Sequence, residues 1–205
     1  MARAAAGDLR ERVAVLELTS TADKSAYTWS EARRIWADAV LDTRSNLFSS
    51  VGIGARGVTF TVRTSASLSL ANAFLWRGHH CFLTSMIPLA GQRGYLEVKA
   101  ALCEPVTLTA KPQARTGRDA LNRPTAVEIP FFTFPGVLTE KYRANEAEDV
   151  YRVTTLRRVL VTPKAIQLRP SDLVEAEGET PYIIRQALDL DPWKNEYELE
   201  RMEDA

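Results

Sequence analysis

The chain has 205 residues, of which 45% are hydrophobic and 25% charged, and its 26 basic side chains balance 26 acidic ones. This composition is sufficient for a packed core, and the balanced charge produces no global attraction to nucleic acid or to a membrane surface. No apolar run approaches the roughly 20 residues of a membrane span, and the first residues lack the apolar core of a secretion signal. Two cysteines are too few for a disulfide scaffold. We therefore expect a protein made in the cytoplasm, with no membrane partner.

The charge is unevenly distributed along the chain. Residues 1–104 carry 12 basic and 9 acidic side chains, a net charge of +3, whereas residues 105–205 carry 14 and 17, a net charge of −3. From Ser171 onward, 3 basic side chains face 11 acidic ones. This polarity suits a molecule between two unlike surfaces, although an acidic solvated tail explains it equally well.

The first half of the chain reads as a series of short strands. Alternation of apolar and polar residues predicts strands at 12–18, 33–40, 58–62 and 95–100, and apolar runs predict strands at 74–76 and 80–87. The turn Arg77-Gly78-His79 and the turn at residues 91–94 connect the last three. Closely spaced strands with glycine-containing turns are typical of a small antiparallel barrel.

A long polar connection, residues 43–57, interrupts this series of strands. Long loops in compact domains often carry function. Arg44 and Arg56 flank this one, so we interpret them as candidate DNA-channel residues. Between Asp42 and Glu97 every charged residue is an arginine; the remaining three form a candidate positive face and are Arg63, Arg77 and Arg93. The alternative is that all five are ordinary solvated arginines.

The second half repeats the pattern of the first. Strands are predicted at 106–109, 158–162, 172–176, 182–185 and 193–199, with an apolar run at 126–134 that Pro135-Gly136 ends. Residues 111–123 read as a mobile polar loop, and residues 138–149 as a short helix. Gly178 follows Gly78 by one hundred residues. We therefore predict an all-β fold with minor α content, made of two small antiparallel barrel or sandwich modules in tandem, 1–104 and 105–205. The second module is interpreted as a duplicate of the first, and the alternative is a similar β-domain whose short strand–turn–strand pattern matches by chance.

No pattern in the sequence predicts catalysis or a cofactor. His79 and Cys81 share one face of a strand, but His80 points to the other face, and a zinc site needs about four ligands. Gly52-x-Gly54-x-x-Gly57 precedes a predicted strand, whereas dinucleotide binding requires a helix at that point. We therefore expect neither an enzyme nor a metal protein, and we expect the aromatic residues to form core.

The order of several short motifs resembles a known family. Leu9-Arg10-Glu11-Arg12-Val13, Trp36-Ala37-Asp38-Ala39-Val40, the serine-containing loop, Val58-Thr59-Phe60-Thr61-Val62-Arg63 and the Gly78 hairpin follow one another. Together, over residues 8–104, they resemble the head-tail joining proteins of tailed bacteriophages, also called head closure, stopper or adaptor proteins. The family is usually about half the length of this chain, so residues 105–205 are an addition.

The resemblance implies a virion structural protein of the neck. Such a protein assembles as a homo-oligomeric ring of about six or twelve copies. It lies between the portal or connector ring and the tail terminator or tail tube proteins. It also retains packaged double-stranded DNA without sequence specificity, with the long loop toward the channel.

Two alternatives stay open from the sequence. One is a tail-completion or tail-terminator protein on the other side of the same junction. The other is a stand-alone β-barrel binding module for carbohydrate or single-stranded nucleic acid, with Trp29 or Trp76 as a stacking surface.

Overall fold

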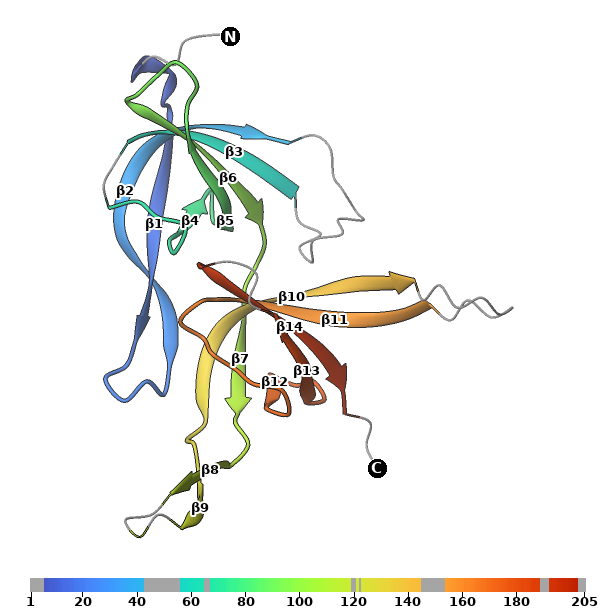
Figure 1. The fold of residues 1–205 in the computed structure, drawn as a ribbon. Helices are drawn as coiled ribbons and strands as arrows, with labels where there is room; N and C mark the ends of the chain where they lie inside the picture. The colour runs from blue at the N-terminus through green and yellow to red at the C-terminus, as the bar shows by residue number, and fades with distance from the viewer. Residues whose placement is uncertain are drawn as a thin grey trace. The chain divides into compact units, whose positions relative to one another are not determined.

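The computed structural model describes residues 6–42, 56–64, 67–118, 121, 123–144, 154–188 and 192–202. They form two compact units (Figure 1). The first unit contains Met1–Thr19 and Trp29–Pro105, and the second contains Ser20–Thr28 and Val106–Ala205. A short stretch near the N-terminus of the chain therefore belongs to the second unit.

The first unit is a closed six-stranded barrel preceded by the 3-10 helix η1 (Ala6–Asp8). Its strands follow the circular order β1-β2-β3-β6-β5-β4. The strand bounds are β1 Glu11–Ser20, β2 Tyr27–Leu41, β3 Arg56–Arg63, β4 Ala73–Trp76, β5 His79–Pro88 and β6 Tyr95–Leu102. The strand β2 begins at Tyr27, whereas the sequence pattern predicted a strand only over residues 33–40.

Alternation along β3 creates the core of this barrel. Val58, Phe60 and Val62 point inward and are at most 1% exposed, as the sequence pattern predicted. The Phe60 ring packs edge-on against Phe74 at 5.4 Å and against Trp76 at 5.7 Å between ring centroids. Edge-to-face packing of this kind adds to the stabilisation from apolar burial.

The second unit is also a closed six-stranded barrel, with the circular order β10-β11-β14-β13-β12-β7. Its strand bounds are β7 Val106–Lys111, β10 Phe132–Ala144, β11 Thr154–Pro163, β12 Leu173–Ala176, β13 Tyr182–Leu188 and β14 Lys194–Arg201. Its core side chains, all at most 2% exposed, include Leu108, Phe134, Leu160, Ile184 and Tyr197. A separate two-stranded hairpin, β8 Arg115–Arg118 and β9 Pro124–Val127, is inserted between β7 and β10.

The two barrels have the same topology. Read around the closed sheet from its first strand, the first follows β1-β2-β3-β6-β5-β4 and the second follows β7-β10-β11-β14-β13-β12. The strand after each glycine turn carries a register shift against its partner, at Leu83/Ser85 in β5 and at Ile184/Gln186 in β13. The prediction of an all-β fold with two barrel modules is confirmed, and the modules match strand by strand.

The entry into the fourth strand of each barrel shows the repeat in detail. Asn72 Oδ1 accepts a hydrogen bond from Ser69 N at 2.9 Å, and Asp172 Oδ2 accepts one from Arg169 N at 2.8 Å. Gly78 and Gly178 then turn the chain with φ of 83° and 77°. Positive φ favours glycine, which explains why a glycine stands at the equivalent turn of each barrel.

Three elements differ from those predicted in the second half. Residues 138–144 belong to the strand β10 and not to a helix, because they pair with β11 from Val137↔Val161 to Ala144↔Thr154. The polar run 111–123 is not wholly a loop, since it contains β8. The apolar run 126–134 is divided between β9 and β10. Charged residues are tolerated in this part of β10 because pairing with β11, and not intrinsic propensity, holds it as a strand.

Pro135 and Gly136 do not end the strand, although the sequence predicted that they would. Residues 132–136 of β10 pair with β7, whereas pairing with β11 begins only at Val137. Pro135 therefore lies where β10 is paired on one side only, and a strand tolerates the missing N–H of a proline at such an edge position. A Cβ on Gly136 would lie 2.6 Å from Leu160 Cδ1 and 2.9 Å from Leu108 Cδ1. The glycine is therefore required by close packing across the barrel.

Candidate functional site

The described arginines of the acid-free stretch lie at two ends of the first barrel. Arg56 opens β3 and pairs with Leu102, and Leu102 also pairs with Cys81 just after the turn that holds Arg77. Arg63 ends β3, and the neighbouring Thr64 Oγ1 donates to Arg93 O at 3.3 Å. Along β3 the two ends are about 23 Å apart at roughly 3.3 Å per residue. Arg44 and most of the connection 43–57 lie outside the described residues.

Arg77 is held by a carboxylate that precedes the acid-free stretch. Its guanidinium forms an ion pair with Glu11, with Nε 3.2 Å from Oε2, and lies 4.9 Å from the centre of the Trp76 ring. Trp76 Nε1 donates to the same Glu11 oxygen at 3.2 Å. The hydrogen bonds from Arg77 and Trp76 lower the pKa of Glu11, and its carboxylate raises the pKa of Arg77. Much of the positive charge of Arg77 is therefore neutralised locally.

The remaining arginines of this set are solvent-exposed. Arg56, Arg63 and Arg93 all present their side chains to water. Arg56 is the described residue adjacent to the long connection that the sequence interpretation assigned to the DNA channel. Its role in binding DNA stays a prediction, as does the positive face.

The histidine–cysteine cluster shows no metal-binding arrangement. His79 is exposed, and its Nδ1 lies 3.2 Å from Glu104 Oε1, whereas His80 and Cys81 are buried. Burial raises the pKa of the Cys81 thiol to about 12, so the thiol form predominates at neutral pH. Among the described residues, no group of three or more histidine, cysteine or acidic side chains is placed to hold a metal ion.

The aromatic side chains only partly follow the expectation that they form core. Phe134 is fully buried and Trp76 is 7% exposed, which leaves little of the Trp76 ring free for stacking. Trp36 and Phe131, by contrast, are 55% and 60% exposed. This difference between buried and exposed aromatic side chains cannot be read from the sequence, because the inward or outward direction of a strand residue depends on the register of the strand.

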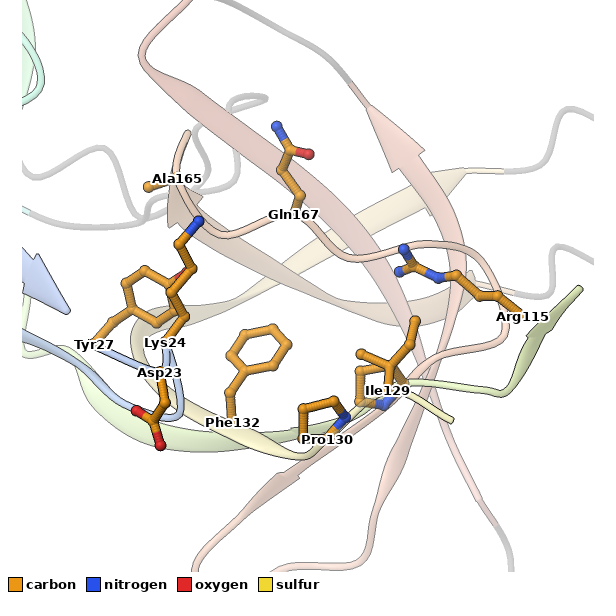
Figure 2. A pocket seen from close by; sticks show the side chains of 10 residues that line it. Asp23, Lys24, Tyr27, Arg115, Ile129, Pro130, Phe132, Ala165 and Gln167 are labelled. Atoms are coloured by element: carbon orange, nitrogen blue, oxygen red, sulfur yellow. The ribbon is translucent and has the colours of Figure 1, made fainter. Parts of the chain in front are cut away.

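A pocket of about 440 Å³ in the second unit combines charged side chains with aromatic surface (Figure 2). The tip of the β1–β2 hairpin contributes Asp23, Lys24 and Tyr27. The β8–β9 hairpin contributes Arg115, and the chain on either side of it contributes Pro112, Ile129, Pro130 and Phe132. The loop after β11 contributes Ala165 and Gln167.

Backbone bonds fix the hairpin tip against the start of β10. Ala26 and Thr133 form a parallel bridge, and Thr133 N donates to Ser25 O at 2.9 Å. The Tyr27 and Phe132 rings meet edge to face with centroids 6.0 Å apart. The tip therefore forms one wall of the pocket and explains why Ser20–Thr28 belongs to the second unit.

The charges in the pocket are unbalanced. Hydrogen bonds from Thr21 and Ser25 lower the pKa of Asp23 to about 2, so its carboxylate is ionised. This carboxylate already accepts hydrogen bonds from Ser25 within its own turn. Lys24 and Arg115 lie on opposite sides of the Phe132 ring in Figure 2. The pocket thus presents two cationic side chains, Lys24 and Arg115, beside apolar surface.

Sequence reasoning did not find this pocket. Its residues come from three distant stretches, none of which is a motif. The only local signal was the proline and aromatic content of residues 129–134, which the sequence interpretation assigned to core.

Comparison with protein-family models, with curated proteins and with solved structures gave no match for this chain. None of the described helical segments has the length and hydrophobicity that a membrane-spanning helix needs. Any functional conclusion therefore rests on the residues and on the geometry described above.

Proposed function

We propose that the chain is a non-enzymatic structural protein of the neck of a tailed bacteriophage. It forms a homo-oligomeric ring between the portal or connector and the tail, retains packaged double-stranded DNA and docks the tail. A head closure, stopper or adaptor role is favoured over a tail-terminator role because the motif resemblance is to head-tail joining proteins.

One observation supports this proposal most strongly. The described motifs that carry the resemblance occupy three strands and one hairpin of a small closed barrel. Glu11 opens β1, Trp36 lies in β2, residues 58–63 lie in β3, and Gly78 connects β4 to β5. A second barrel of the same topology doubles the surface available for contacts with neighbours. Rings use such repeated surfaces to contact unlike partners on their two sides.

DNA retention in this proposal depends on the arginines beside the long connection. Phosphate attraction requires positive charge but no base contact, so exposed arginines such as Arg56 suffice. Arg77 is a weaker candidate for a phosphate contact, because its guanidinium already forms an ion pair with the Glu11 carboxylate.

The decisive experiment removes the gene from the phage that encodes the chain and examines the lysate by electron microscopy. Heads that have lost their DNA, together with complete free tails, are the expected result for a head closure protein. DNA-filled heads with unattached or malformed tails would shift the assignment to tail completion. Intact virions would refute the neck role.

A charge-reversal pair tests the DNA contact within the same system. We expect Arg56→Glu to release packaged DNA, with soluble folded protein at the wild-type level. Arg63→Glu, at the other end of the same strand, is the matched control and should retain DNA. Equal DNA loss in both variants, or loss of soluble protein in Arg56→Glu alone, would contradict a specific contact at the Arg56 end.

A further inference from the structure

The pocket of the second unit combines two cationic side chains with an apolar surface. Within the part of the chain that the structure describes, neither Lys24 nor Arg115 has an ion pair or a side-chain hydrogen bond. The nearby carboxylate of Asp23 bonds to Ser25 N at 3.1 Å and to Ser25 Oγ at 2.8 Å. Figure 2 shows this carboxylate directed away from the Phe132 ring. Two positive charges are therefore available on either side of an apolar floor.

The floor determines what kind of anion fits. Tyr27, Phe132, Ile129 and Pro112 provide aromatic and aliphatic surface between the two cations. Duplex DNA presents phosphates on a convex exterior and does not fill an apolar pocket. A short acidic peptide with one flexible apolar side chain satisfies both the charges and the floor.

The chain itself carries such a segment. Met202 is 44% exposed at the end of the described residues, and Glu203 and Asp204 follow it in the sequence. Met202 N donates to Pro181 O at 2.9 Å, so the backbone of this residue is tied to the loop before β13. A methionine packs readily on aromatic rings, and the two acidic residues equal Lys24 and Arg115 in number and are opposite to them in charge.

The strand register puts this segment at the other end of the barrel from the pocket. The β11–β12 loop that lines the pocket begins at Lys164, whose N donates to Trp193 O at 2.9 Å, immediately before β14. Then β14 runs from Lys194 to Arg201, about 23 Å along the strand at roughly 3.3 Å per residue. One copy therefore presents the pocket and the acidic segment at opposite ends of the same barrel.

We infer that the pocket binds the acidic segment Met202–Asp204 of a second copy of this chain. Met202 packs on Phe132 and Tyr27, and Glu203 and Asp204 pair with Lys24 and Arg115. A contact between unlike ends of identical subunits is head-to-tail, and it closes into a ring when the rotation between copies fits. This inference rests on the ring-forming part of the proposed function and identifies one contact that builds the ring.

The test uses the full-length protein and a fluorescently labelled peptide that spans residues 199–205. Fluorescence anisotropy should show salt-sensitive binding to the wild-type protein. The double variant Lys24→Glu with Arg115→Glu should bind about tenfold more weakly, because two attractive charges become repulsive. Arg169→Glu, an exposed arginine in the β11–β12 loop that does not line the pocket, is the matched control and should bind normally. Circular dichroism confirms that each variant is folded.

A second peptide, with Glu203→Gln and Asp204→Asn, tests the acidic side chains directly and should lose a similar factor. Absence of binding, equal binding by the double variant, or equal binding of the neutral peptide would each overturn the inference. So would a double variant that binds the peptide normally but loses binding of a DNA duplex.

The failure of this inference is distinguishable from the failure of the proposed function. A wild-type protein that ignores the peptide refutes the pocket contact, whatever the deletion lysate contains. Intact virions in the deletion experiment refute the neck role, whatever the peptide does.

Discussion

A buried histidine predicts how the stability of the first barrel depends on pH. His80 in β5 is 5% exposed, its ring lies 5.5 Å from Trp29 between centroids, and its Nε2 has no hydrogen-bond partner among the described residues. Burial lowers its pKa to about 4, a shift that the charge of Glu104 only partly opposes. Its charged form is therefore strongly disfavoured in the folded state.

The sign and size of the effect follow from linkage. The unfolded chain binds a proton at His80 near pH 6.5 and the folded chain only near pH 4, so lowering the pH through this window favours unfolding. The stability that the neutral His80 side chain allows is fully present above the pKa of the unfolded chain, and it is lost as the pH falls toward the folded pKa. Between about pH 8 and about pH 5 we expect His80 to cost about 2 kcal/mol of unfolding free energy.

The assay is urea denaturation of the wild type and of His80→Phe at several pH values. Phenylalanine keeps a ring against Trp29 but does not titrate, so the variant should lose about 2 kcal/mol less on acidification. Ser85→Ala is the control, because Ser85 lies on the same strand and carries no titratable group, so the pH dependence should be that of the wild type. Equal pH dependence in His80→Phe and the wild type would refute the reasoning, since another group would then carry the acid sensitivity.

Two further predictions concern the second barrel. Asp172→Ala should lower the unfolding free energy by about 2–4 kcal/mol, because two backbone N–H groups lose their acceptor. In the wild type, Gln113 N and Arg169 N lie 3.0 and 2.8 Å from the Asp172 carboxylate. Urea denaturation measures this loss, and a value below about 0.5 kcal/mol would contradict the prediction. Gly136→Ala should cost about 1–3 kcal/mol through overpacking against Leu160 and Leu108. Gly7→Ala is its control, since a Cβ there meets nothing within 4 Å; equal melting temperatures of the two alanine variants would exclude the overpacking.

The sequence by itself determined the fold class and most of the strands. Alternation at residues 58–62 predicted which side chains of β3 are buried, because successive strand residues point to opposite faces. The spacing of Gly78 and Gly178 predicted the repeat, since a turn that needs positive φ leaves a glycine in the sequence. These signals are local, so they can be read without a fold.

Only the tertiary structure decided where β10 runs and what surrounds the pocket. Residues 138–144 extend as a strand because β11 pairs with them, and Pro135 is tolerated because one side of β10 is unpaired at that point. The pocket joins Lys24, Arg115 and Gln167, which are far apart in the chain. Such contacts depend on barrel closure and strand register, which involve residues distant in sequence and leave no local pattern.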